Sequence, residues 1–466
     1  MAYDNLLEQT LAHAQRFLDS LPTRPVGATA SLEEVRQAFD HPLPDNGIGS
    51  SRAIEELATR ADPGLVASAG PRFFGFVIGG SHPAALAADW LTSTWDQNTG
   101  LYVISPTAAV LEEVAAKWLL ELLDLPRQSG VGFVTGGQMA NFTCLAAARH
   151  AVLKEVGWDV EAEGLIGAPT VYVLVGRDAH VSILVALRFL GLGGERVRHV
   201  DTDDQGRMIP ADLVRVLNDC DGPTIVCAQA GDVNTGAFDP FSEITAAVHE
   251  HGGWVHVDGA FGLWAAATPS VQHLAHGMSD ADSWAVDGHK WLNVPYDSGI
   301  AIVRDQDAHR AAMGVSAAYL IKSAGAERDN VDYTPEFSRR GRGIPVYAVL
   351  SALGRNGLIA MIERCCSHAR RLRRQLIQDA MVKPLNDVVL NQVLVRFEPP
   401  QGDPDEFVRA VVRNIQQDGT CWLSGTRWRG REAMRASIVN WSTTQDDIDR
   451  SAEAILRVAH DTAKRS

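Results

Sequence analysis

The middle of the chain alternates short apolar runs with helical stretches, and this alternation limits the possible folds more than any other feature. The runs read GVGFVTGG, TVYVLVG, TIVCAQAG, GWVHVDG and SGIAIVRD, and segments with helical periodicity separate most of them. Short apolar runs of this kind are typical of strands that are buried on both faces. Strands that alternate with helices form βα units around a parallel sheet. The sequence therefore predicts an α/β domain with a mostly parallel central sheet.

Segments of different character flank this core in the chain of 466 residues. The first part has helical periodicity, broken by the turn-rich stretch PLPDNGIGS. Towards the end, a long helical pattern precedes the strand-like VLNQVLVRFEPP and a helical tail. We therefore expect a helical N-terminal segment over 1–80, a large α/β domain over 81–345 and a small C-terminal α+β domain over 346–466.

The charge and the apolar pattern exclude some partners. The formal net charge is −15, with 57 acidic residues against 42 basic ones. We expect no nucleic-acid partner, because phosphate backbones are bound by basic faces. The absence of an eighteen-residue apolar run argues against a membrane partner, and the early acidic residues of MAYDNLLEQ argue against a signal peptide. We expect a cytoplasmic protein, with six reduced cysteines that form neither disulfides nor a metal site.

Lysine is rare in this chain, and one lysine has unusual neighbours. Only six of the 42 basic residues are lysines. Lys290 lies between His289 and Trp291, in a loop between two apolar segments. A lysine desolvated among aromatic side chains becomes a usable amine nucleophile, which arginine cannot become. The alternative is an ordinary surface lysine whose stem packs on apolar neighbours.

Three other features lie at the expected ends of strands. Thr135, Gly136 and Gly137 join a strand to a helix, where exposed amides suit a phosphate, although a simple tight turn has the same pattern. Asp258 ends the strand WVHV, at the sheet edge where ligands bind in open α/β folds, although such an Asp often only caps a turn. His180 follows the strand TVYVLVG and could either stack on a planar ligand or serve a structural role.

Taken together, these features fit pyridoxal 5'-phosphate. An amine can form a Schiff base with the aldehyde of this cofactor. A carboxylate can keep its pyridine nitrogen protonated, so that the ring draws electrons, and a helix start can hold its phosphate. The combination indicates this cofactor far more specifically than any one residue does.

The order of motifs also resembles a known family. TGGQMAN, DAHVS, AGDVNTGAFDP, HVDGAFG, DGHKWLNVPYDSG and DYTPEFSRRGRG are similar to segments of the group II pyridoxal-phosphate-dependent amino-acid decarboxylases, such as aromatic-L-amino-acid and glutamate decarboxylases. The likeness extends from PRFFGFVIGG to about residue 355 and faintly to the C-terminus. It implies the type I pyridoxal-phosphate fold and a homodimer with shared active sites.

The resemblance assigns roles to matching positions. Lys290 matches the Schiff-base lysine, Asp258 the partner of the pyridine nitrogen and His180 the imidazole that stacks on the ring. The remaining cofactor-binding positions are Ala260 on the other face of the ring, Gly137, Gln138 and Met139 in the phosphate turn, and His289 before the lysine. Two positions depart from the family pattern. Met139 stands where a Ser is frequent, so any phosphate contact there would come from the backbone, and Asp232-Val233 replaces a frequent Thr-Thr.

Two further parts of the resemblance concern the reaction. Tyr333 matches the tyrosine of a catalytic loop, and the polar stretch from Lys322 to Tyr333 is expected either to open and close over the site or to be a surface linker. Either Tyr333 or His180 would return a proton to the substrate. The substrate pocket is assigned to four residues, which ordinary core packing would explain equally well: Phe74, Phe76, Leu101 and Tyr102, the last two donated by the second subunit.

We therefore expect a pyridoxal-phosphate-dependent carboxy-lyase that converts an L-amino acid, with an aromatic one as first candidate, to its amine and CO2. Decarboxylation of an acidic amino acid is the nearest alternative. Aldehyde synthesis or aminotransfer on the same cofactor, and a non-catalytic homologue, are more distant alternatives.

Overall fold

The computed structural model describes residues 4–315 and 327–465 and contains two compact units. The central unit comprises Gly79–Arg370 and Leu385–Val393. The terminal unit comprises Met1–Ile78, Arg371–Pro384 and Leu394–Ser466. The expected 1–80 segment and most of the expected C-terminal domain thus belong to the same unit.

The central unit is built on a seven-stranded sheet in the order β1-β7-β6-β5-β4-β2-β3. Its strands are β1 (Gly130–Val134), β2 (Tyr172–Gly176), β3 (Arg198–Val200), β4 (Thr224–Gln229), β5 (Trp254–Asp258), β6 (Ser283–Asp287) and β7 (Gly299–Val303). All neighbouring pairs are parallel except those of β7, which runs antiparallel to both β1 and β6. The predicted mostly parallel α/β sheet is confirmed.

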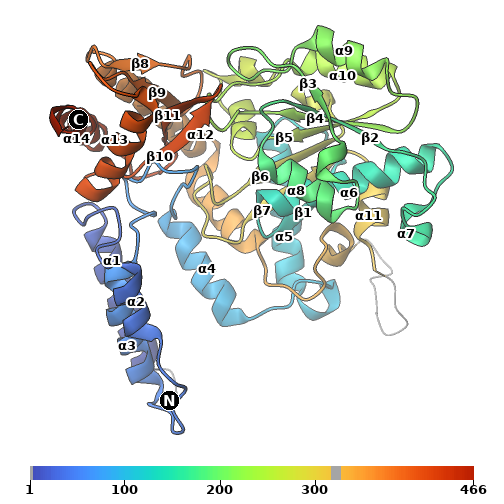
Figure 1. Cartoon of the computed structure of the whole chain (residues 1–466). Helices are drawn as coiled ribbons and strands as arrows, with labels where there is room; N and C mark the ends of the chain where they lie inside the picture. Colours follow the sequence, from blue (N-terminus) through green and yellow to red (C-terminus); the bar gives the residue numbers. More distant parts are fainter. Residues whose placement is uncertain (1–3, 316–326, 466) are drawn as a thin grey trace. The chain divides into compact units, whose positions relative to one another are not determined.

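The central unit also contains helices, several of which contact strands of this sheet (Figure 1). They are α4 (Pro83–Trp95), α5 (Pro106–Leu122), α6 (Gly137–Glu155), α7 (Val160–Glu163), α8 (Val181–Phe189), α9 (Pro210–Leu217), α10 (Phe241–Glu250) and α11 (Gln306–Met313). The chain reverses its direction across the sheet after β3. Because connections between parallel strands are right-handed as a rule, helices before and after this reversal are expected on opposite faces of the sheet. Accordingly α6 packs with α8, and α10 packs with α9 on the other face. Alanines in α6, among them Ala140, Ala146 and Ala147, are fully or almost fully buried and let this helix lie close to the sheet.

The strand directions determine where loops meet. Because β7 is antiparallel to both β1 and β6, these two strands run the same way as β5, β4 and β2. The carboxyl ends of all five therefore lie at one edge of the sheet. Polar residues that follow these strands are brought together at this edge.

The terminal unit combines helices with a second sheet in the order β10-β11-β9-β8. Its helices are α1 (Asp4–Ser20), α2 (Leu32–Phe39), α3 (Ser50–Ala61), α13 (Pro404–Asp418) and α14 (Gln445–Arg465). Its strands are β8 (Val382–Pro384), β9 (Gln392–Phe397), β10 (Ser424–Trp428) and β11 (Arg431–Ser437). Helix α13 packs on β11 and on α14, mainly through buried Phe407, Val411 and Ile415. The expected α+β character of the C-terminal region is confirmed.

Helix α12 (Gly343–Leu376) is long and apolar enough to cross a membrane by length and composition alone. Core helices of soluble proteins pass the same test. Its helical backbone is interrupted at Gly354, where φ is 59° and ψ is −178°. Arg355 follows directly at this break. A charged residue beside a broken turn argues against a spanning role for this helix.

All six cysteines are unpaired and buried: Cys144, Cys220, Cys227, Cys365, Cys366 and Cys421. Burial raises the pKa of the Cys144 and Cys421 thiols to about 12. The expectation that these residues form no disulfide framework agrees with this arrangement.

Candidate functional site

Lys290 lies in the loop that follows β6, where a carboxylate holds its amine. Lys290 Nζ is 3.7 Å from Asp287 Oδ2, and the two side chains are 19% and 3% exposed. The ring of His289 stacks on Tyr296 with 4.4 Å between ring centroids. Trp291 on the other side of the lysine is fully buried. Lys290 is therefore a largely enclosed amine, in contrast to the surface lysine that was the alternative.

The first turn of α6 lies against this loop. The helix begins at Gly137, and the N-cap residue Gly136 offers no side chain to cap the first amides. A Cβ atom at Gly137 would lie 2.8 Å from Asp287 Oδ2 and 3.7 Å from Ala260 Cβ. A side chain there would push against the Asp287 carboxylate, so the segments at the ends of β1, β5 and β6 meet closely at Gly137.

The other two residues of the expected phosphate turn differ in exposure. Gln138 is exposed, whereas Met139 is half-buried and packs against the hydrophobic core of the central unit. The side chain of Met139 is therefore occupied in packing. This agrees with the expectation that any ligand contact at this position comes from the backbone.

Asp258 ends β5 and is 6% exposed. The side-chain amide of Asn141 donates to Asp258 Oδ2 at 3.0 Å. The backbone amide of Ala260 donates to Asp258 Oδ1 at 3.2 Å. Each carboxylate oxygen thus has a fixed donor, which orients the carboxylate at the loop edge of the sheet.

Sequence reasoning did not identify the residues behind Asp258. Asn141 Oδ1 lies 2.9 Å from His256 Nε2, and both residues are completely buried. Asn141 is the last residue of the motif TGGQMAN, and His256 is the first residue of the motif HVDGAFG. Their contact was not foreseeable, because it joins a helix and a strand that are 115 residues apart.

His180 is linked to the same group. It is the N-cap residue of α8, and its Nδ1 accepts from the Ser182 amide at 3.3 Å. Ser182 Oγ lies 2.8 Å from the same nitrogen and also accepts from Asn141 Nδ2 at 3.2 Å. One buried amide, that of Asn141, therefore contacts both Asp258 and the residue that holds His180.

Asp232, one of the two departures from the family pattern, is 1% exposed. Its Oδ1 accepts from the backbone amides of Asn234 and Thr235, each at 2.8 Å. Burial raises the pKa of the Asp232 carboxyl. These contacts give Asp232 a structural role in the turn after β4.

Tyr333 has a different environment from the one expected. It ends the short helix η7 (Asn330–Tyr333) and is 4% exposed. Arg310 Nε donates to its phenol oxygen at 3.1 Å, and the Arg328 guanidinium lies 3.9 Å from its ring centroid. A Cβ atom at Gly132 of β1 would lie 2.1 Å from the Tyr333 carbonyl oxygen. Glycine in β1 thus lets this segment pack tightly against the sheet.

The segment from Lys322 to Tyr333, expected either to open and close over the site or to be a surface linker, is therefore anchored at its C-terminal end. Its first residues, 322–326, lie outside the described part of the chain. Among the described residues, the side chain of Tyr333 contacts Arg310, Arg328 and His309. Its role in the reaction stays a prediction.

The four expected pocket residues fall into two pairs. Phe74 and Phe76 belong to the terminal unit, where Phe74 is 1% exposed and Phe76 is 56% exposed and stacks on Trp422 with a centroid distance of 5.7 Å. Leu101 and Tyr102 belong to the central unit, where Leu101 is buried and Tyr102 begins the short helix η2 (Tyr102–Ile104). Phe74 thus has the core-packing role that was the alternative for this set.

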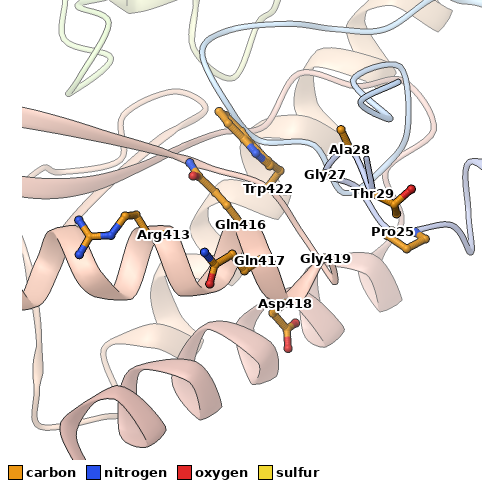
Figure 2. Close-up of a pocket in the computed structure, with 10 residues that line it drawn as sticks. All are labelled: Pro25, Gly27, Ala28, Thr29, Arg413, Gln416, Gln417, Asp418, Gly419 and Trp422. Carbon is orange, nitrogen blue, oxygen red and sulfur yellow. The ribbon is translucent and has the colours of Figure 1, made fainter. Parts of the chain in front are cut away.

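A cavity of about 550 Å³ lies within the terminal unit, next to the end of α13 (Figure 2). Polar side chains and Trp422 line it: the ten residues are Pro25, Gly27, Ala28, Thr29, Arg413, Gln416, Gln417, Asp418, Gly419 and Trp422. None of the predicted site residues is among them. This cavity contains no amine nucleophile, so we do not place the reaction there.

The group around Lys290 has the donors that pyridoxal phosphate requires. Ser298 Oγ is buried and has no hydrogen-bond partner within residues 4–315 and 327–465, whereas Asp287 Oδ1 and His289 Nδ1, also buried, lie 3.0 Å from each other. Unpaired buried polar atoms are rare in proteins. Together with the uncapped α6 amides, the Ser298 hydroxyl offers donors to a phosphate, and Lys290 offers an amine to an aldehyde. The residues therefore fit this cofactor.

Comparisons with known proteins show the family of the chain. The model of the pyridoxal-dependent decarboxylase conserved domain matches residues 33–398. Cysteine sulfinic acid decarboxylase of Mus musculus is 30% identical over 442 residues, covering 90% of this chain and 87% of that protein. Aromatic-L-amino-acid decarboxylase of Bacillus atrophaeus is 25% identical over 448 residues, covering 92% of this chain and 90% of that protein. The crystal structure of mouse CSAD has a TM-score of 0.90 at 25% identity and covers 98% of each chain. The crystal structure of Oryza sativa TDC with PLP and tryptamine has a TM-score of 0.91 at 23% identity and covers 98% of this chain and 97% of that chain.

Proposed function

Since the chain belongs to the pyridoxal-dependent decarboxylase family, it is a pyridoxal-phosphate-dependent amino-acid decarboxylase, and we propose that Lys290, Asp258 and His180 carry out its reaction. The observation that supports this assignment is the convergence of these residues. They follow three different strands, and the Asn141 side chain links Asp258 to the Ser182 hydroxyl that holds His180. Such a convergence of an amine, a carboxylate and an imidazole is expected of a catalytic site.

Each residue has a distinct task in the proposal. The bound cofactor supplies a ring that stabilises the negative charge left on Cα when CO2 departs. Lys290 anchors the cofactor through its amine, and its place beside Asp287 keeps that amine at the start of α6. Asp258 presents a fixed carboxylate to the pyridine nitrogen, which favours the protonated form of that nitrogen. The amides of Gln138 and Met139 at the helix start receive the phosphate.

We assign the return of the proton to Cα to His180. Its Nδ1 accepts from Ser182, so the neutral imidazole carries its proton on Nε2. Nε2 of His180 can therefore act as a donor. The Tyr333 phenol accepts from Arg310 Nε at 3.1 Å and donates to Gln306 Oε1 at 3.4 Å, so its own proton already has an acceptor within this chain. Tyr333 as the donor is the alternative.

Conservative variants distinguish these two donors. We expect His180→Phe, which keeps a flat ring and removes the donor, to lower the rate of amine formation by about two orders of magnitude. We expect Tyr333→Phe to form amine at nearly the wild-type rate, without extra aldehyde or hydrogen peroxide. Product analysis of both variants by chromatography, with a peroxide assay, measures this. A Tyr333→Phe enzyme that is slow and releases aldehyde and peroxide would assign the proton to Tyr333.

For the substrate we propose an aromatic L-amino acid. Tyr102, an assigned pocket residue of the central unit, is partly exposed within this chain and is available to contact an aromatic side chain. The similarity to an aromatic-L-amino-acid decarboxylase supports this choice. A second candidate is an acidic amino acid, which the 30% identity to a cysteine sulfinic acid decarboxylase favours.

Substrate profiling tests the function and separates the two candidates. The purified enzyme is incubated with pyridoxal phosphate and each of the common amino acids, their hydroxylated forms or cysteine sulfinate, and CO2 and amine are measured. We expect equal amounts of CO2 and amine from an aromatic substrate. Release from glutamate, aspartate or cysteine sulfinate alone would establish the acidic class, and a keto acid or aldehyde product would overturn simple decarboxylation.

We also propose that the enzyme is a homodimer with shared sites. Consecutive segments of the central unit, α4, η2 and α5, carry large exposed apolar side chains: Trp90, Leu91, Trp95, Val103, Ile104 and Val110. Extended apolar surface of this kind usually marks an interface. The assigned pocket residue Tyr102 lies in the middle of these segments, which is consistent with its donation to the other subunit.

Subunit mixing tests the shared site. Lys290→Ala and Tyr102→Ala homodimers are each expected to be nearly inactive. When they are mixed and exchanged, each heterodimer should regain one intact site, so about a quarter of the wild-type activity should return. Mass spectrometry confirms the exchange. If heterodimers form and no activity returns, the two subunits do not share a site.

A further inference from the structure

A chain of buried hydrogen bonds runs through the sheet and ends on Asp258. Trp254 Nε1 donates to Ser283 Oγ at 2.9 Å, and Ser283 Oγ lies 2.9 Å from His256 Nδ1. His256 Nε2 lies 2.9 Å from Asn141 Oδ1, and Asn141 Nδ2 donates to Asp258 Oδ2 at 3.0 Å. Trp254 and Asp258 are 7% and 6% exposed, and the three residues between them are fully buried. The chain is thus shielded from water along its whole length.

The chemistry of the two end groups fixes the direction of every bond. An indole N–H can only donate, and a carboxylate can only accept. The nitrogen of the Asn141 amide must therefore face Asp258, which leaves its oxygen facing His256. The Ser283 hydroxyl, which accepts from Trp254, is free to donate to His256 Nδ1. His256 is then the link that donates from Nε2 and accepts at Nδ1.

The state of His256 agrees with this direction. Burial lowers the pKa of His256 to about 4, so the imidazole is neutral and carries a single proton at neutral pH. A neutral imidazole has one donor and one acceptor nitrogen, as the chain requires. Hydrogen bonds that all point the same way polarise one another, and so the last donor, Asn141, is strengthened by those behind it.

On the basis of the proposed function, we propose that His256 is a positioning residue for Asp258, acting through Asn141. The His256 Nε2 proton holds the Asn141 oxygen and thereby keeps the amide nitrogen directed at the carboxylate. Without the Nε2 proton of His256, the Asn141 amide can rotate so that its oxygen faces Asp258. Two hydrogen-bond acceptors, the amide oxygen and the carboxylate, would then face each other. His256 thus sets the orientation of the carboxylate that pairs with the cofactor nitrogen, although it touches neither cofactor nor substrate.

Two replacements of His256 separate this role from simple core packing. His256→Gln can keep a donor towards Asn141, whereas His256→Met fills similar space without one. We expect His256→Met to weaken binding of pyridoxal phosphate to the apoprotein about tenfold and to lower kcat by a similar factor with KM unchanged, while His256→Gln stays within about threefold of wild type. Thr245→Val is the matched control, because Thr245 is a buried polar residue of the same unit whose hydroxyl bonds only within α10.

Ser283→Ala provides a second route if His256→Met does not fold. It keeps the imidazole and removes the hydroxyl that fixes its tautomer, so we expect a smaller loss of cofactor affinity, about threefold, in the same direction. Equal cofactor affinities in His256→Met, Ser283→Ala and the Thr245→Val control would overturn the proposal. So would a His256→Gln protein that binds the cofactor as poorly as His256→Met.

A double-variant cycle shows whether His256 acts through Asp258. In the Asp258→Asn background, His256→Met should change cofactor affinity and kcat by less than about twofold, because the carboxylate it positions is absent. A full tenfold loss in that background would mean that His256 acts elsewhere and would overturn the inference. If Asp258→Asn alone has no effect on rate, the failure lies in the proposed function instead, so the two failures are distinguishable.

Discussion

Replacement of Lys290 by alanine is expected to have the largest effect of any single change, with loss of at least about three orders of magnitude in kcat. The amine that anchors the cofactor disappears, and the remaining site can hold pyridoxal phosphate only through noncovalent contacts. Borohydride treatment followed by peptide mapping measures the covalent link directly. We expect a reduced adduct on the peptide that contains Trp291 in the wild type and none in the variant.

The control for this experiment is Lys154→Ala, since Lys154 is exposed in the last turn of α6 and far along the helix from Gly137. It should keep both the adduct and wild-type turnover. Lys290→Arg preserves a positive charge beside Asp287 and should be as inactive as the alanine variant, because a guanidinium cannot act as the nucleophile. A Lys290→Ala enzyme with wild-type turnover would refute the assignment.

Replacement of Asp258 by asparagine should reduce kcat by about two orders of magnitude or more, the scale seen when one preorganised polar group is removed from a site. The change keeps the size of the side chain and removes its negative charge. The pyridine nitrogen then loses the charge that favours its protonated form. We expect the variant to retain part of its cofactor, so the measurement is turnover together with bound pyridoxal phosphate per subunit.

Asp282→Asn is the matched control for this loss of charge. Asp282 accepts from the backbone amide of Val255 at 2.7 Å, so it is also a carboxylate fixed by the backbone, but it precedes β6 and lies near the amino end of the parallel strands. It should change stability without changing kcat by more than about threefold. Similar kcat losses in both variants would indicate a general effect of removing a carboxylate.

The sheet could be predicted from the sequence, and the candidate site residues could be proposed from it, because both depend on local patterns. Buried strands are visible as apolar runs, and a residue that directly follows a parallel strand must lie at the carboxyl edge of the sheet. Gly137, Asp258 and Lys290 could be brought together on this basis before any coordinates were known. The Lys290–Asp287 contact is also local, since Asp287 ends β6 and Lys290 lies three positions further along the chain.

What the sequence could not predict are contacts between elements that are distant in the chain. Asn141 and His256 pair only because α6 crosses β5, which depends on the strand order. The polar neighbours of Tyr333 predicted either a segment that opens and closes over the site or a surface linker. Tyr333 is nevertheless buried. Gly132 leaves space on β1 for its backbone, and the guanidinium groups of Arg310 and Arg328 contact its side chain. A glycine within a strand indicates that another segment packs closely against the strand, but the sequence does not tell which segment it is.

The burial of all six cysteines has a practical consequence. A thiol reacts with maleimides and similar reagents as the thiolate, and enclosed thiols with a raised pKa are poor nucleophiles. The native protein should therefore resist alkylation, and its own cysteines need not be removed before labelling. A single cysteine introduced at an exposed position such as Ser50 would be a unique attachment point for a fluorophore, so subunit exchange could be followed in real time with an otherwise unaltered chain.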